Sequence, residues 1–264
     1  MEKIPVRHID KVVGNVNEGK KDFLDFLDDL GKDKIEGELE KTSRDKELIS
    51  FSQKCLDEYL LEFGKNDIYK IPNEKIHILP VGGIEKITYG SFKKGVASPK
   101  WGAIAVDKEP NDITFSIILF HEMYHIKNFT SINFDENELA YSERRSGFTV
   151  FVDDEAYFGL INETLNDYMC KKFFEEKIKR SNLFKKEEVD NYVFELSRNK
   201  LLDLFEQKSE EIFQKNRDQF NSKEDIKKLF FDADINGNLL PVARLIEKTF
   251  GKGKFRELGE NMRK

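Results

Sequence analysis

The chain has 264 residues, of which 36% are charged and 39% hydrophobic, and its net charge at pH 7 is −6. This balance is typical of a globular protein with a sizeable core and excludes a disordered chain. The mild charge gives no reason to expect nucleic acid or a membrane as a partner, and no segment has the apolar length of a signal peptide or membrane span, so we expect a cytoplasmic protein.

Two amphipathic segments predict a helical N-terminal part over residues 1–72. Apolar residues recur at helical spacing over residues 23–30 and again over residues 48–63. A glycine follows each stripe, Gly31 in the first case and Gly64 in the second, which is typical of a helix C-terminus. These stripes predict core-facing helices without chemistry of their own.

From residue 73 the sequence becomes rich in β-branched residues, which predicts a small sheet at the start of a central part, residues 73–180. We predict three strands, at residues 76–81, 87–90 and 102–107. A turn-rich stretch, residues 93–100, separates the last two. A break then precedes a long helix, which Asp112 or Thr114 could cap.

That helix carries the pattern His121-Glu122-Met123-Tyr124-His125 at the end of an apolar run that begins near Phe115. The run contains no Pro or Gly and is long enough for a buried helix. Residues four apart share a helical face, so His121 and His125 could hold one Zn²⁺ between them. Glu122 lies one position round the helix, where it could act as general base toward a water that the metal activates. The alternative is a buried helix whose histidines bind no metal.

A catalytic zinc needs a third protein ligand, and we expect a carboxylate because no histidine follows His125. The best candidate is Glu163, near the start of a second helical stretch, residues 159–179. Asp167 lies four residues later on the same face, where it could reach a ligand histidine and fix its tautomer. Other carboxylates between the two helices are alternatives to Glu163: Asp135, Glu136, Glu138, Glu143, Asp153, Asp154 and Glu155.

A His-Glu-x-x-His motif followed by a helix with Asn162-Glu163-x-x-x-Asp167 resembles the gluzincin metallopeptidases, the thermolysin-like group. The small single-domain members, the minigluzincins, are the closer comparison. The resemblance covers roughly residues 100–175 and implies one Zn²⁺ per chain, held by His121, His125 and Glu163. It makes Glu122 the general base and Asp167 the group that orients a ligand histidine. The connection between the two motifs is longer than in thermolysin, so the substrate contacts of that loop do not transfer.

The fold that this resemblance implies is α+β, mostly helical and zincin-like, with a small mixed sheet packed on the helix that carries HExxH and on the helix that carries Glu163. In gluzincins the edge strand of the sheet binds extended substrate, and we place that role on residues 101–106, with an interior strand as the alternative. The implied activity is hydrolysis of peptide bonds in a peptide or protein. The other function considered is a catalytically silent or self-blocked zinc-binding module that acts through protein interaction.

The oxyanion of a tetrahedral intermediate needs a stabilising group, which the sequence does not identify uniquely. The candidates are Arg144, Arg145, Tyr141, Tyr157 and Tyr168. We favour Tyr157, because it lies just ahead of the helix that carries Glu163.

The rest of the chain predicts structure without a further site. Residues 181–264 predict a helical subdomain that closes one side of the cleft. Within it, residues 232–238 resemble the first half of a Ca²⁺ loop, but Ala243 stands where a bidentate Glu is needed, so we expect a turn between helices. Cys55 and Cys170 lie far apart in helix-like sequence and should be free thiols, buried or half-buried.

Overall fold

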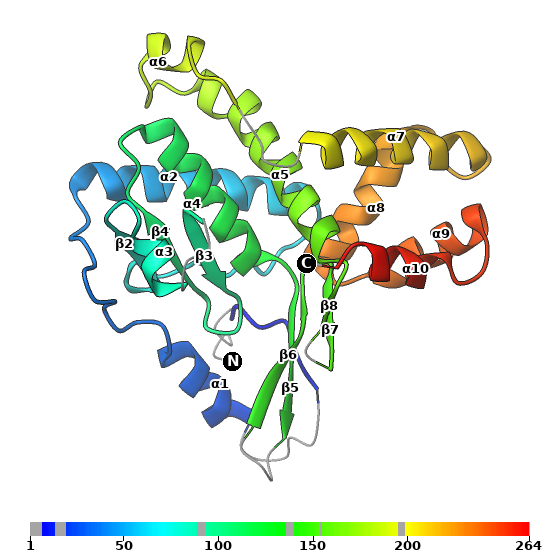
Figure 1. The fold of residues 1–264 in the computed structure, drawn as a ribbon, viewed down its shortest axis with the longest axis horizontal. Coiled ribbons are helices and arrows are strands. Elements are labelled where there is room, and N and C mark those ends of the chain that lie inside the picture. The colour runs from blue at the N-terminus through cyan, green and yellow to red at the C-terminus, as the bar shows by residue number, and fades with distance from the viewer. Residues whose placement is uncertain are drawn as a thin grey trace.

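The protein is described by a computed structural model that covers residues 7–13, 20–88, 93–135, 140–153, 155–194 and 199–263 (Figure 1). The fold is α+β and mostly helical, with small mixed sheets, as the sequence predicts. None of the helices in these ranges is long and apolar enough to cross a membrane.

The helices are α1 (Lys20–Asp29), α2 (Ser43–Glu62), α3 (Gly83–Ile87), α4 (Asp112–Lys127), α5 (Gly159–Glu176), α6 (Lys186–Asp190), α7 (Asn199–Lys215), α8 (Lys223–Asn236), α9 (Leu239–Phe250) and α10 (Lys254–Asn261). The strands are β1 (Lys11–Val13), β2 (Ile76–Leu79), β3 (Gly95–Ser98), β4 (Ala103–Asp107), β5 (Thr130–Asp135), β6 (Ala140–Ser146), β7 (Thr149–Val152) and β8 (Glu155–Tyr157). In Figure 1, α7 to α10 gather beyond α5, on the side away from α2 and the first sheet.

The first sheet lies against α4 and has the strand order β2-β4-β3. β2 and β4 are parallel, and β3 is antiparallel to β4, so β3 is an edge strand and β4 is interior. The prediction of a substrate-binding edge at residues 101–106 is therefore wrong, because β4 has a neighbour on each side. The predicted strand at residues 87–90 is also wrong for its first two residues, since Ile87 ends α3 and Thr88 is its C-cap. Residues 89 and 90 lie outside the described ranges.

The second sheet has the order β1-β5-β6-β7-β8 and is built mainly from the chain between the two motif helices. β5 to β8 form an antiparallel meander, and β1 joins β5 in parallel. One face buries Ile132 against Leu27 of α1, while Phe23 of α1 stacks on Phe134 with ring centroids 4.0 Å apart. This sheet was not predicted from the sequence.

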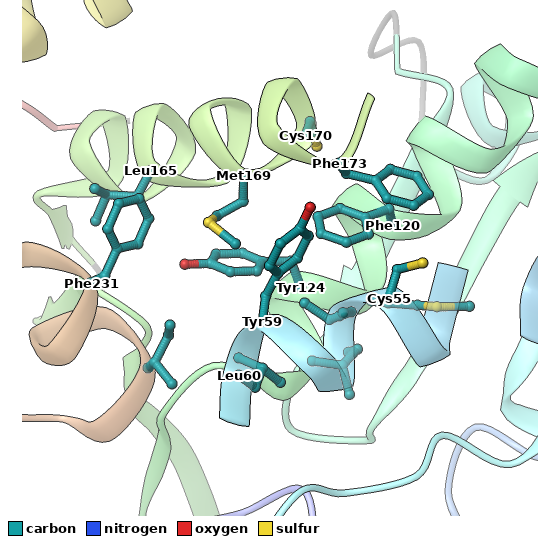
Figure 2. Close-up of a cluster of buried hydrophobic side chains, with 14 of the residues drawn as sticks. Cys55, Tyr59, Leu60, Phe120, Tyr124, Leu165, Met169, Cys170, Phe173 and Phe231 are labelled. Atoms are coloured by element: carbon teal, nitrogen blue, oxygen red, sulfur yellow. The ribbon is translucent and has the colours of Figure 1, made fainter. Parts of the chain in front are cut away.

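The helix α4 lies at the centre of the main core, which explains its continuous apolar run. Phe120 stacks on Phe173 of α5, with centroids 4.3 Å apart, and Tyr59 of α2 meets Phe120 edge-on (Figure 2). The helix begins after Asn111, whose side chain accepts a hydrogen bond from the backbone N–H of Thr114 at 2.9 Å. The prediction that Asp112 or Thr114 caps the helix is therefore wrong. The cap is Asn111, the residue just before the helix, whose backbone is extended.

The C-terminal helices pack onto the start of α5. The backbone N–H of Leu160 donates to the carbonyl of Met262 at 3.0 Å, which satisfies one of the N–H groups that a helix N-terminus leaves unpaired. A Cβ at Gly259 of α10 would lie 2.6 Å from the ring of Phe158, so only glycine allows this approach. No Ca²⁺ loop forms at residues 232–238, because residues 232–236 are the last turn of α8. The predicted turn between helices is confined to Gly237, which has a left-handed conformation, and Asn238. Both cysteines are free and buried, as predicted.

Candidate metal site

The helices α4 and α5 bring the three predicted ligands together. Nε2 of His121 lies 3.5 Å from Oε2 of Glu163, and Nε2 of His125 lies 3.7 Å from its Oε1. One ligand atom from each of the three residues can be chosen so that all lie within 4.8 Å of one another. Ligand atoms at 2.0–2.1 Å from a tetrahedral zinc lie roughly 3.4 Å apart, so these residues fit such an ion with little movement.

The chemistry of the donor set also fits zinc. Two imidazoles and one carboxylate form a known catalytic zinc set that keeps a position open for water or substrate. Glu163 is only 4% exposed. Burial alone would raise its pKa, but the charge of His125 and hydrogen bonds from His121 and His125 outweigh burial and hold the pKa of Glu163 far below its usual range. A buried carboxylate that stays ionised between two imidazoles is a strong cation ligand.

Residues of α5 also contact the far sides of the two imidazoles. Asp167 places Oδ1 3.8 Å from Nδ1 of His121, and Sγ of Cys170 lies at 3.8 Å from the same nitrogen. Nδ2 of Asn162 lies 3.4 Å from Nδ1 of His125. Asp167 thus lies near the imidazole that it was predicted to orient, and that role stays a prediction, whereas Asn162 and Cys170 were given no role from the sequence. Their spacing with Asn166, four residues from each, was the available signal, because Asn162, Asn166 and Cys170 line one side of α5.

Glu122 lies beside this cluster and against the edge strand β3. Its side chain is 7% exposed, and a Cβ at Gly95 would lie 2.7 Å from its Oε1. The absence of a side chain at Gly95 therefore leaves the space that the carboxylate occupies. This arrangement puts the carboxylate of the residue that follows His121 against the first residue of the edge strand.

The favoured oxyanion residue, Tyr157, makes its described contacts away from the metal cluster. Its hydroxyl donates to Glu155 at 3.0 Å and accepts from Nη2 of Arg263 at 2.9 Å. The guanidinium of Arg263 also lies over its ring, 4.4 Å from the centroid. Tyr157 therefore needs to leave these partners to reach a substrate.

The other oxyanion candidates also make their described contacts elsewhere. The guanidinium of Arg145 donates to the carbonyls of Gly147, Ala233 and Gly237, at 2.8, 2.5 and 2.6 Å. It holds the end of α8 against the β6–β7 turn. Tyr141 contacts Phe23 and Trp101, Tyr168 packs on Phe205 and Phe231, and Arg144 is exposed.

Among the described residues, the metal cluster contains no carboxylate other than that of Glu163. Among the alternative ligands, Glu143 of β6 is the one most like Glu163, because it is also a shielded carboxylate. Burial raises the pKa of Glu143, and the charges of Lys100 and His125 partly offset this. Its Oε1 has no hydrogen-bond partner in the described part of the chain. Asp153 and Glu155 are exposed on the second sheet. Four alternatives fall where the structure does not describe the side chain: Asp135, Glu136, Glu138 and Asp154.

A separate apolar cavity of about 410 Å³ lies behind α5, on the face opposite Glu163. Ile161 and Thr164 of α5 form one wall, and residues of α7 to α10 form the rest. None of the three clustered ligands lines this cavity, so it is distinct from the metal site.

Comparison with known protein families gives one match. A family model described as "Putative zinc dependent peptidase (DUF5700)" matches residues 34–264. The chain belongs to this family. The match with the zinc-dependent peptidase family includes α4 and α5 and extends over all the C-terminal helices. A search of curated proteins and a search of solved structures each found no match. The family description supports a zinc-dependent peptidase in general.

Proposed function

We propose that this chain is a zinc metallopeptidase of the gluzincin type, with His121, His125 and Glu163 as the ligands of one zinc ion. The observation that carries this proposal is the convergence of the three ligand atoms within 4.8 Å of one another. It is supported by the family match, by the burial of Glu163 and by the contact of Asp167 with His121. The gluzincin assignment rests on the order of the motifs and on a carboxylate third ligand.

The reaction is hydrolysis of a peptide bond with Glu122 as general base. A bound zinc ion supplies Lewis acidity to a water molecule and to the scissile carbonyl. Glu122 accepts a proton from the attacking water through its carboxylate and then passes that proton to the nitrogen of the leaving amine. Its position supports this role, because Glu122 follows the ligand His121 on α4 and its buried carboxylate lies against Gly95.

The substrate is an extended peptide that adds to the outer edge of β3, which pairs with no strand other than β4 in the described part of the chain. β3 is antiparallel to β4 and starts at Gly95, beside Glu122. Backbone pairing with an edge strand aligns a peptide without reference to its side chains. A peptide paired with β3 would run past Gly95, the residue of β3 that lies against Glu122. Tyr157 is our proposed oxyanion donor, after release from Glu155 and Arg263.

A cleavage assay tests this function. The purified chain is incubated with a mixed peptide library, treated with a chelator, and then supplied again with zinc. We expect cleavage in the first state, loss in the second and recovery in the third. The same assay with Glu122→Gln should show no cleavage in any state. Cleavage that persists after complete zinc removal would exclude the proposed function.

A further inference from the structure

A polar cluster is buried behind the metal site, where α4, α8 and the β6–β7 turn meet. Asp234 of α8 is its centre and is fully buried, with 0% exposure. Its Oδ2 accepts hydrogen bonds from the hydroxyl of Tyr124 at 2.7 Å and from Nδ2 of Asn128 at 2.9 Å. Its Oδ1 accepts from the backbone N–H of Phe148 at 2.7 Å. In Figure 2 the hydroxyl of Tyr124 points away from Phe120, toward the ribbon of α8.

Asn162 of α5 connects this cluster to the ligand His125. Its Oδ1 shares the N–H of Phe148 with Asp234, at 2.9 Å, while its Nδ2 lies 3.4 Å from Nδ1 of His125. Gly147 permits this crowding, since a Cβ there would collide with Oδ1 of Asn162 and would lie 2.5 Å from Oδ1 of Asp234. The side-chain amide of Asn162 therefore lies between an imidazole and a buried carboxylate.

The chemistry of a zinc ligand dictates which way this amide must face. A neutral imidazole that binds metal through Nε2 carries its proton on Nδ1, so Nδ1 of His125 is a donor and requires an acceptor. The NH₂ group of Asn162 is also a donor and cannot serve. A half-turn of the amide presents its oxygen to Nδ1 of His125 and turns its NH₂ group toward Oδ1 of Asp234, and the backbone N–H of Phe148 then donates to Oδ1 of Asp234 alone. An ionised carboxylate only accepts hydrogen bonds, so it suits that NH₂ group.

We propose that Asp234 is a positioning residue of the zinc site: it accepts a hydrogen bond from the NH₂ group of Asn162, whose oxygen accepts one from Nδ1–H of His125. This chain of contacts fixes the tautomer and orientation of His125 from a helix 109 residues further along the sequence. The inference rests on the proposed function. Partners behind a ligand histidine typically contribute 10- to 100-fold to metal affinity.

The test compares zinc affinity in Asp234→Asn and in a matched control, Tyr124→Phe, by competition with a chromophoric chelator at one pH. Asp234→Asn removes the negative charge of the group that accepts a hydrogen bond from the NH₂ group of Asn162. We therefore expect zinc binding to weaken by roughly 10- to 100-fold. Tyr124→Phe removes a hydrogen bond to the other carboxylate oxygen, Oδ2, and leaves the contact with Asn162 intact. It should lower thermal stability and leave zinc affinity within a factor of about three. Equal zinc affinity in Asp234→Asn and the wild type, or equal losses in both variants, would overturn the proposal.

Two further readouts separate a positioning role from a purely structural one. In protein labelled with ¹⁵N-histidine, the Nδ1–H proton of His125 should exchange slowly with solvent in the zinc-loaded wild type and faster in Asp234→Asn. Asn162→Ala should lose zinc affinity to the same extent, and adding Asp234→Asn to it should cause no further loss. If Asp234→Asn does not fold, wild-type affinity in Asn162→Ala still refutes the inference. A wild-type chain that binds no zinc refutes the proposed function instead.

Discussion

The side chain of Glu122 and the backbone of Gly95 fill adjoining space between α4 and the edge strand β3, so that a Cβ at residue 95 would lie 2.7 Å from both Cγ and Oε1 of Glu122. The proposed general base and the strand proposed to bind substrate are thus in direct contact. A change on the strand should therefore reach the base without touching a metal ligand.

Gly95→Ala should displace the carboxylate of Glu122 and lower kcat, while zinc content stays at the wild-type level. Overpacking of this kind costs about 1–3 kcal/mol of stability, which thermal unfolding would measure. Gly83→Ala is the matched control, because its Cβ would meet Leu79 at 2.5 Å, in a part of the first sheet away from Glu122. The control should lose stability and keep its kcat. An unchanged kcat in Gly95→Ala would contradict the prediction that this contact holds the carboxylate of Glu122 in place for catalysis.

Glu122→Gln should keep zinc and lose turnover by roughly 100- to 10,000-fold, because an amide fills the same space but cannot accept the proton. His121→Ala should lose both zinc and turnover, since it removes a ligand. Metal analysis and peptide hydrolysis on the same preparations measure the two properties. Near wild-type hydrolysis by Glu122→Gln would show that another group is the base.

Asp234 should make the stability of the zinc-free protein depend on pH. Burial raises the pKa of Asp234 from 3.8 to about 6, against the opposing hydrogen bonds from Tyr124 and Phe148. The folded state therefore holds this proton more tightly than the unfolded chain. The resulting stabilisation is present below about pH 4 and is lost as the pH rises through 6, by roughly 3 kcal/mol at most.

Urea unfolding in the presence of a chelator, repeated between pH 4 and pH 7, measures this dependence. Asp234→Asn has no group that titrates at this position, so its free energy of unfolding should change less across the interval than that of the wild type. Parallel curves for the two proteins would contradict the assignment.

Tyr157→Phe tests the proposed oxyanion donor. If the hydroxyl leaves Glu155 and Arg263 to meet the substrate, its removal should lower kcat by roughly 100-fold and leave zinc content unchanged. Tyr141→Phe is a suitable control, because Tyr141, on β6 of the second sheet, contacts Phe23 of α1 and Trp101. Steady-state kinetics on a cleaved library peptide compare the three proteins. Equal values of kcat in Tyr157→Phe and wild type would remove Tyr157 from the mechanism.

The sequence predicts the helices of the site well because their signals are local. The i, i+4 spacing of His121 and His125 and the long apolar run around them need only helical periodicity, and the structure places both helices where expected. Glu163 was identified on the same basis. The bounds of α5 and the free state of both cysteines also follow from local patterns.

The edge strand and the second sheet could not be predicted in this way. β3 is four residues long, Gly-Val-Ala-Ser, and is flanked by lysines and a proline that indicate a turn. Its strand character comes from pairing with β4, a tertiary contact. In β5 to β8, a bulge at Ser131/Ile132 and many polar residues interrupt the alternation on which strand prediction depends.

The buried role of Asp234 could not be predicted from the sequence either. In the sequence it belongs to an Asp-x-Asp-x-Asn-Gly pattern that resembles an exposed ion-binding loop. In the structure Asp232 is partly exposed and Asn236 is exposed, and their side chains bond to each other, while Asp234 points into the core toward Tyr124. Helical periodicity separates these residues onto different faces, but only packing against α4 and α5 gives one of them a buried role.

The most direct measurement of the central claim is the zinc content per chain of protein purified without added metal, for the wild type and Glu163→Ala side by side. The account predicts about one zinc per wild-type chain and much less in the variant, because the variant keeps two imidazoles and loses the carboxylate between them. Equal zinc in both proteins would exclude Glu163 as a ligand. No zinc in either would contradict the metallopeptidase assignment itself.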